Sequence, residues 1–285
     1  MSAPTDTIVL IHGLWMTPRS WEHWITRYES RGYTVLAPAW RGLEGEVEEL
    51  RRDSAPLAKV GLRKVIERYD DIIRRLPTQP IIMGHSTGGT IVQVLLDRGL
   101  GAAGVAIAPA TVKGVYDVRL STLKASGHII ANPFTRGKAT SSSETQFRFA
   151  FGNTQTEAES HAAYERYYVP SANNVLFDVA FANFSRETTT EVNFAKDKRA
   201  PMLFIAGEKD NVVPPKTARS NVEKYSNAAV VTDYKEFPGR SHFIAGERGW
   251  EEVADYALTW ATQHVSADET VPGSVGDRIA FASRA

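Results

Sequence analysis

The chain contains no cysteine. This absence excludes disulfide bonds, metal sites built on thiolates and a cysteine nucleophile. It leaves the compartment open, because a chain of 285 residues can bury a large core without covalent cross-links. The length is sufficient for one large α/β domain or for two small domains.

Net charge and long apolar stretches are also absent. Lys plus Arg and Asp plus Glu each number 33, and the basic residues are scattered along the chain. We therefore expect neither nucleic acid nor an anionic membrane surface as a partner. No apolar stretch approaches the roughly 18 residues that a membrane-spanning helix needs, so integral membrane association is not expected either. Residues 1–7 lack the charged and apolar regions of a signal peptide, and we expect a cytoplasmic protein.

Motifs for metals and cofactors are missing as well. The sequence has no HExxH motif, no close pair of histidines on a predicted helix and no acidic cluster with the spacing of a metal site. It also lacks a glycine-rich dinucleotide-binding fingerprint and a phosphate-binding P-loop. We expect no metal ion and no organic cofactor.

Short apolar segments alternate with helical patterns along most of the chain. The apolar segments are typical of buried parallel strands, and helical spacing between them predicts helices on both faces of one sheet. Residues 41–56 are polar and irregular, without either pattern. We expect six strands, at residues 8–11, 33–37, 81–83, 103–108, 202–206 and 230–237.

Residues 111–199 interrupt this alternation. They contain no comparable buried strand and are rich in Ser, Thr and aromatic residues. Thr156 and Glu159 have the spacing of a capping box, which predicts the start of a helix. We interpret the segment as a mostly helical cap over the carboxyl edge of the sheet. The predicted division is a core of residues 1–110 and 200–266, a cap of residues 111–199 and a polar, peripheral tail of residues 267–285.

The sequence Gly84-His85-Ser86-Thr87-Gly88 matches the pattern GxSxG. It directly follows an apolar strand and directly precedes a helix with an apolar stripe, which is the setting of a nucleophile elbow. So tight a turn requires a strained backbone at Ser86, and side chains at positions 84 and 88 would collide with neighbouring segments. The turn holds the hydroxyl out at the sheet edge, above the N-terminus of the following helix. We therefore predict Ser86 as a nucleophile.

A serine hydroxyl needs a base to remove its proton, and chain position selects among seven histidines. His242 follows the last predicted strand and precedes the final helix, so it should lie at the same carboxyl edge as Ser86. Position makes it the predicted general base. The remaining histidines outside the motifs lie in predicted helices or in the insertion: His23, His128, His161 and His264.

The carboxylate that orients the base should lie on the same edge, between Ser86 and His242 in the sequence. Asp210 fits, because it leaves the fifth strand directly and precedes a stiff Val-Val-Pro-Pro segment. Its role would be to accept a hydrogen bond from the imidazole, which fixes the tautomer and stabilises the imidazolium. Glu208 is a nearby rival and Asp117, after the fourth strand, is a more distant one.

Acyl transfer also needs two backbone N–H groups that stabilise the developing oxyanion. We expect one from Thr87, next to the nucleophile, and one from Leu14, on the loop after the first strand. Gly13 would let that loop approach the serine. His85 is expected to point into the structure. The substrate pocket is predicted to include the neighbours of these groups: Trp15, His85 and Phe243.

Together these residues resemble the α/β-hydrolase superfamily, over about residues 7–265, and most of all its small bacterial esterases and monoglyceride-lipase-like members. The family's initial strand hairpin is missing, so about six mainly parallel strands are expected. In this resemblance the triad corresponds to Ser86, Asp210 and His242, the oxyanion donors to Leu14 and Thr87, and the family's cap to residues 111–199.

The resemblance implies a serine hydrolase that cleaves a carboxylic ester, or a related acyl bond of a small molecule, through an acyl-enzyme on Ser86. A neutral, aromatic-rich insertion favours an apolar substrate. Dehalogenase and epoxide hydrolase chemistry is disfavoured, because those relatives carry Asp at the position of Ser86. Acyl transfer, perhydrolysis, lactone opening, carbon–carbon cleavage and a non-catalytic receptor stay open as alternatives, as do the substrate and the oligomeric state.

Overall fold

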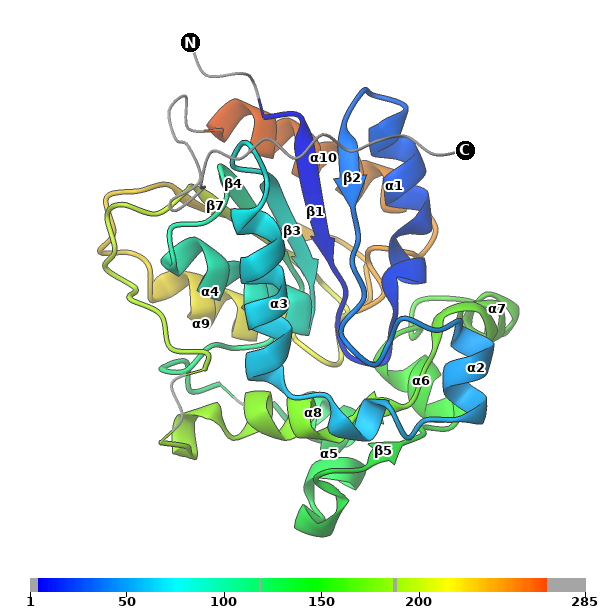
Figure 1. The fold of residues 1–285 in the computed structure, drawn as a ribbon. Helices are drawn as coiled ribbons and strands as arrows, with labels where there is room; N and C mark the ends of the chain where they lie inside the picture. Colours follow the sequence, from blue (N-terminus) through cyan, green and yellow to red (C-terminus); the bar gives the residue numbers. More distant parts are fainter. Residues whose placement is uncertain (1–4, 118, 187–188, 266–285) are drawn as a thin grey trace.

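A parallel sheet of six strands forms the centre of the computed structural model, which describes residues 5–117, 119–186 and 189–265. The strand order is β2-β1-β3-β4-β7-β8, and every neighbouring pair is parallel (Figure 1). The predicted α/β fold class and all six predicted strands are confirmed. The strands are β1 (Thr7–Ile11), β2 (Thr34–Leu36), β3 (Ile81–His85), β4 (Ala103–Ile107), β7 (Met202–Gly207) and β8 (Thr232–Phe237).

Helices cover both faces of this sheet, because alternate strand residues point to opposite sides. Ile8 and Leu10 pack in a cluster with α1 (Glu22–Glu29) and α10 (Trp250–His264). Val9 and Ile11 pack on the other side, in a cluster with residues of the helices that lie in front of the sheet in Figure 1. Those front helices are α3 (Leu62–Arg74), α4 (Thr87–Asp97) and α9 (Pro215–Glu223).

One helix, α2 (Val47–Arg52), lies within the stretch of residues 41–56 that shows no regular pattern in the sequence. Only Val47 and Leu50 of its residues are buried, so the helix is too short to produce a visible apolar period. It is followed by a short 3-10 helix, η2 (Leu57–Lys59). The side chain of Arg51 donates to the backbone carbonyls of Tyr164 and Tyr168, so this helix is fastened to the insertion.

The insertion between β4 and β7 is mostly helical and lies beyond the carboxyl ends of the strands (Figure 1). Its capping box is present: the Glu159 amide donates to the Thr156 hydroxyl at 3.2 Å and the Thr156 amide donates to the Glu159 carboxylate at 2.9 Å. Its elements are α5 (Leu120–Ile130), η3 (Pro133–Thr135), β5 (Ala139–Thr140), α6 (Glu144–Ala150), α7 (Glu157–Tyr167), β6 (Ser171–Ala172), α8 (Asn173–Ala180) and η4 (Ala182–Phe184). The strands β5 and β6 pair with each other in an antiparallel fashion.

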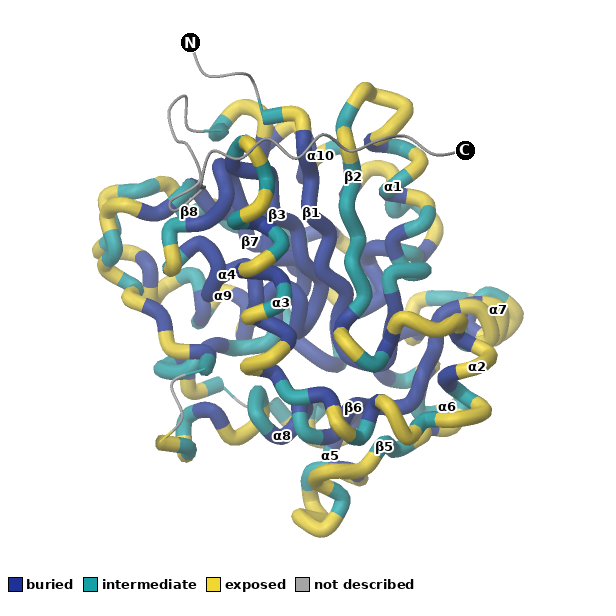
Figure 2. The backbone as a smooth tube through the Cα atoms, viewed as in Figure 1, coloured by how far each residue is buried: buried dark blue, intermediate teal, exposed yellow. Residues whose placement is uncertain are grey.

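Burial follows this architecture: the four central strands β1, β3, β4 and β7 are buried throughout, whereas the edge strands β2 and β8 are mostly half-buried, and exposed positions concentrate on the outer helices and loops (Figure 2). The predicted peripheral tail, from residue 267 onward, lies outside the described residues. Within residues 5–265 as described, no helix has both the length and the apolar character that crossing a membrane requires.

Candidate active site

Strained backbone gathers at one edge of the sheet. Among the described residues, only three other than glycine have a positive φ: Trp15 at 64°, Ser86 at 56° and Ala108 at 44°. Each directly or closely follows one of the neighbouring strands β1, β3 and β4. Backbone conformations of this kind cost of order 1–3 kcal/mol each and persist where surrounding structure enforces them. Their clustering at the carboxyl ends of adjacent strands marks the edge as a candidate site.

Ser86 forms a sharp turn between β3 and α4, with φ 56° and ψ −120°. A Cβ atom on Gly84 would overlap the carbonyl of Gly88, and one on Gly88 would overlap the carbonyl of Ile11. The turn therefore tolerates no side chain at either position, as the motif predicted. The Ser86 amide donates to the Ile107 carbonyl at 2.8 Å, which ties the turn to the neighbouring strand.

The structure brings Ser86, His242 and Asp210 into one chain of hydrogen bonds. The Ser86 hydroxyl lies 3.0 Å from His242 Nε2, and His242 Nδ1 lies 2.7 Å from a carboxylate oxygen of Asp210. Because the carboxylate can only accept, Nδ1 carries the proton and Nε2 is free to accept from the hydroxyl. All three residues are buried, with His242 at 0% exposure. This is the arrangement that activates a hydroxyl nucleophile.

The second carboxylate oxygen of Asp210 is held by the backbone. It accepts hydrogen bonds from the amides of Val212 and Val213, each at 2.7 Å. These bonds favour the ionised carboxylate and fix its orientation toward His242. The loop after β7 thus holds the Asp210 carboxylate in a fixed position beside the His242 imidazole.

The two rival carboxylates lie elsewhere. Glu208 pairs with Lys209 and accepts from the amide of Gly239, and these contacts lower the pKa of its carboxyl. Asp117 pairs with Arg119 and accepts from the hydroxyl of Ser220. Neither contacts His242 in the described hydrogen bonds and ion pairs, so geometry selects Asp210.

The loop after β1 lies against Ser86. A Cβ on Gly13 would stand 2.8 Å from Ser86 Cβ and 3.4 Å from its Oγ, so only glycine permits this approach. Leu14 follows this contact directly. Thr87 is the first residue of α4, where an amide has no carbonyl partner within the helix. Leu14 therefore follows the residue that approaches Ser86, and Thr87 follows Ser86 itself, so both predicted oxyanion donors stay candidates.

The predicted pocket residues occupy three different settings. Trp15 lines a small cavity next to the site. Phe243 instead packs on the ring of Tyr167, with centroids 5.6 Å apart, and is not among the residues that line this cavity. The cavity measures about 10 Å³ and is lined, among the described residues, by Trp15, Ala125, Ser142, Gln146, Phe147, Ala150, Phe151, Tyr168 and Val212.

His85 lies behind His242 and is not among the residues that line the small cavity. Its Nε2 is 2.8 Å from the backbone carbonyl of His242, so the carbonyl accepts from Nε2–H. The two rings lie 4.8 Å apart. Burial, followed by the neighbouring His242, lowers the pKa of His85 to about 3. A neutral His85 therefore supports the backbone of His242, in line with the expectation that it points into the structure.

Two residues that the sequence analysis did not assign to the site complete its surroundings. The ring of Phe151, from the insertion, meets the His242 ring edge-on at 4.9 Å. The carboxylate of Glu247 is buried and accepts from the amide and hydroxyl of Ser241, at 3.0 and 2.8 Å, and from Thr154 at 2.6 Å. No local motif identifies either residue, because their roles depend on contacts between distant parts of the chain.

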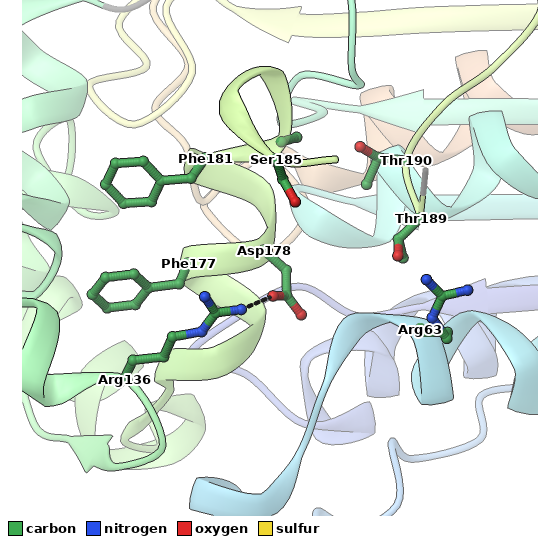
Figure 3. Close-up of a pocket in the computed structure, with 9 residues that line it drawn as sticks. Arg63, Arg136, Phe177, Asp178, Phe181, Ser185, Thr189 and Thr190 are labelled. Carbon is green, nitrogen blue, oxygen red and sulfur yellow. Dashed lines mark hydrogen bonds and ion pairs between the residues drawn. The ribbon is translucent and has the colours of Figure 1, made fainter. Parts of the chain in front are cut away.

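A larger cavity, of about 270 Å³, lies between α3 and α8 and is a separate feature (Figure 3). Asp178 dominates it: one carboxylate oxygen pairs with Arg136 at 2.9 Å, and the other accepts from the Leu62 amide at 3.3 Å at the start of α3. None of Ser86, Asp210 and His242 is among its lining residues. Its lining combines Arg63 of α3 with residues of the insertion, so this cavity lies where the insertion meets the core. Within the described residues, no three His, Asp or Glu side chains gather as a possible metal site.

Comparisons with known proteins agree with this architecture. The model of the alpha/beta hydrolase family matches residues 8–256. A monoacylglycerol lipase from Paleococcus ferrophilus is 20% identical, with 92% of this chain and 96% of that chain covered and a TM-score of 0.62. An extracellular alpha/beta-hydrolase from a Paenibacillus species is 18% identical, with 90% and 99% covered and a TM-score of 0.67.

A pyrethroid hydrolase from Sphingobium faniae is 19% identical, with 90% of this chain and 97% of that chain covered and a TM-score of 0.58. At these identities the solved structures establish a shared fold alone. A search of curated protein sequences gives no match.

Proposed function

The chain belongs to the alpha/beta hydrolase family, and from this premise we propose that it hydrolyses carboxylic esters through an acyl-enzyme on Ser86. The observation that carries the proposal is the continuous contact from the Ser86 hydroxyl through His242 to Asp210, at 3.0 and 2.7 Å. Structural relatives that are named as a monoacylglycerol lipase and a pyrethroid hydrolase are consistent with this reaction.

In the first half-reaction Ser86 Oγ attacks the ester carbonyl carbon while its proton moves to His242 Nε2. Asp210 stabilises the imidazolium that results. The carbonyl oxygen becomes an oxyanion and accepts hydrogen bonds from the Leu14 and Thr87 amides. When this intermediate collapses, the bond to the alcohol oxygen breaks and His242 gives its proton to the departing alcohol.

In the second half-reaction water attacks the acyl-enzyme. His242 Nε2 takes a proton from the water, and the same two amides stabilise the second oxyanion. Collapse breaks the bond to Ser86 Oγ, which recovers its proton from His242, and the carboxylic acid leaves. Every proton that moves in either half is carried by His242.

The small cavity beside Trp15 fits the acyl group of the substrate. Trp15 directly follows Leu14 in the loop after β1, and the ring of Phe151 meets the ring of His242. A group bound between Trp15 and Phe151 would therefore sit next to the reacting carbonyl. At about 10 Å³ the cavity has room for at most about one water molecule, which is close to the size of a methyl group. Acetyl-sized acyl groups are therefore preferred, and longer chains require Phe147 and Phe151 to move.

Turnover of a p-nitrophenyl ester series, from acetate to octanoate, tests this proposal. Wild-type protein should release p-nitrophenol fastest from the acetate, and Ser86→Ala should lose at least about 10⁴-fold in kcat. Ser126→Ala is the matched control, because Ser126 is a buried serine of α5 that donates to a helix carbonyl. Adding methanol or hydrogen peroxide tests acyl transfer and perhydrolysis directly. Equal rates in wild type and Ser86→Ala would refute the proposal.

A further inference from the structure

His12, at the end of β1, is a buried histidine outside the proton-transfer chain, with 1% exposure. Its Nδ1 lies 2.9 Å from the carbonyl oxygen of Gly13, and the amide of Trp40 lies 3.4 Å from its Nε2. Its ring stacks on the indole of Trp40, with centroids 4.6 Å apart and planes inclined by 24°. Both ring nitrogens and one ring face are thus engaged.

These partners define the tautomer of His12. A carbonyl oxygen only accepts, so Nδ1 carries the hydrogen, and a backbone amide only donates, so Nε2 is the acceptor. Burial lowers the pKa of His12 to about 4, although the hydrogen bond to Gly13 opposes this effect. The ring is therefore neutral near pH 7, and a neutral ring can satisfy both partners at once.

The bond to Gly13 orients the next amide. All described peptide bonds are trans, and in a trans peptide the carbonyl and the following N–H point in opposite directions. Fixing the Gly13 carbonyl toward His12 therefore directs the Leu14 N–H away from His12. Gly13 itself lies against Ser86, within reach of its hydroxyl.

The Trp15–Met16 peptide of the same loop is fixed by the insertion. The amide of Val169, in the insertion, donates to the Trp15 carbonyl at 2.9 Å. Trp15 adopts φ 64°, so the chain turns sharply here. One hydrogen bond from the core and one from the insertion therefore hold the two carbonyls on either side of the Leu14–Trp15 segment.

We propose that His12 is a positioning residue for the oxyanion site: its Nδ1–H holds the Gly13 carbonyl so that the Leu14 amide faces the oxyanion formed at Ser86. The inference rests on the proposed ester hydrolysis and adds a residue that neither receives nor donates the transferred proton. The oxyanion carries its charge only in the tetrahedral intermediate, so the contribution of His12 appears in kcat and leaves ground-state binding unchanged.

Three substitutions at position 12 distinguish the hydrogen bond at Nδ1, the hydrogen bond at Nε2 and the stacking of the ring. His12→Asn places an amide N–H near the position of Nδ1, whereas His12→Gln reaches the position of Nε2 and leaves the Gly13 carbonyl without its donor. His12→Phe keeps the stacking on Trp40 and removes both hydrogen bonds. We expect kcat to fall about 10²-fold in His12→Gln and His12→Phe, while KM stays within about 3-fold of the wild-type value. His12→Asn should retain most of the wild-type kcat.

His264 provides a matched control within the same chain. It also stacks on a tryptophan, Trp260, at 4.3 Å and 16°, and its Nδ1 also lies 2.8 Å from a backbone carbonyl, that of Trp260. It lies at the end of α10, outside the site. His264→Phe should leave kcat within about 2-fold of wild type, and urea unfolding of all variants reports any general loss of stability.

A trifluoromethyl ketone inhibitor gives the second readout, because its adduct with serine carries a real oxyanion. Its Ki should rise in His12→Gln by the same factor by which kcat/KM falls. The control is the same inhibitor with a methyl ether in place of the ketone, which forms no oxyanion, and its Ki should not change. A kcat loss that His12→Asn fails to rescue, or an unchanged inhibitor Ki, overturns the inference. Wild-type protein without ester turnover overturns the proposed function, and this inference with it.

Discussion

The carboxyl edge of the sheet and the insertion that covers it are built by different means. At the edge, backbone atoms approach one another so closely that Gly13, Gly84 and Gly88 cannot carry a side chain without overlap or close contact. Three residues there are held in strained backbone conformations. The side chains at this edge are therefore held on a framework that hardly adapts, which is what the proposed chemistry requires.

The insertion depends instead on side chains. Phe147 stacks on Phe151, with centroids 5.1 Å apart, and α2 holds the segment through the side chain of Arg51. Large apolar side chains on its outer surface are exposed, with Leu120 at 86% and Phe184 at 82%. The comparison supports the proposal that the edge determines which reaction occurs and that the insertion determines which substrate groups reach it.

The largest expected effect is at the orienting carboxylate on the edge. Asp210→Asn should lower kcat/KM by about 10⁴-fold, because an amide can favour the wrong imidazole tautomer and cannot stabilise the imidazolium. Glu208→Gln, two residues away and exposed, should stay within about 2-fold. Steady-state kinetics on p-nitrophenyl acetate measure both. Similar losses in the two variants would contradict the assignment of Asp210.

A pair of glycines compares the two regions directly. Gly88→Ala should lower the free energy of unfolding by at least about 3 kcal/mol, because its Cβ would overlap the Ile11 carbonyl. Gly127→Ala, in α5 of the insertion, meets nothing within 4 Å and should stabilise the protein by about 0.5–1 kcal/mol. Urea unfolding gives both values. A tolerated Gly88→Ala would show that the edge adapts after all.

Two neutral histidines of the edge make stability depend on pH. Burial lowers the pKa of His12 to about 4 and that of His85 to about 3, from about 6.5 when unfolded. The unfolded chain then binds more protons below pH 6.5, so stability is greatest above that pH and falls as the solution is acidified toward pH 4. From pH 8 to pH 5 each histidine should contribute a loss of about 2 kcal/mol.

Urea unfolding at a series of pH values checks this expectation. In His12→Asn the loss of unfolding free energy between pH 8 and pH 5 should be smaller by about 2 kcal/mol, because asparagine does not titrate. His161→Gln is the control from the insertion, where His161 is exposed and pairs with Glu144. The same change in slope for both variants would contradict the claim that burial at the edge causes the effect.

The smallest expected effect is a change of selectivity in the insertion. Phe147→Ala enlarges the cavity beside Trp15 and should raise kcat/KM for the butyrate ester about 10-fold relative to the acetate. Ala125→Val narrows the same cavity and should shift the ratio the other way. Competition between the two esters measures both. Unchanged ratios would place the acyl group elsewhere.

The strands of the core and the residues at their ends could be predicted from the sequence, because the physical constraints on them are local. Strands buried on both faces leave continuous apolar segments, and the residues that follow them meet at one edge, so Ser86, Asp210 and His242 could be selected by position alone. The crowded elbow required glycine at both flanking positions, and this too is visible in the motif.

Contacts between distant segments could not be predicted. Phe151 meets His242, and Thr154 meets Glu247, only because the insertion folds back over the edge. His85 adjoins the nucleophile in sequence, yet its side chain turns behind His242. Helix α2 was invisible because two buried residues give no period.

The central claim is that the hydroxyl of Ser86 is the nucleophile, and a fluorophosphonate probe tests it most directly. Wild-type protein is treated with the probe, digested and analysed by mass spectrometry, beside Ser86→Ala and Asp210→Asn. The account predicts one adduct on the peptide that contains Ser86, no adduct in Ser86→Ala and much slower labelling in Asp210→Asn. An adduct on another serine, or ester turnover by a protein that never becomes labelled, would contradict it.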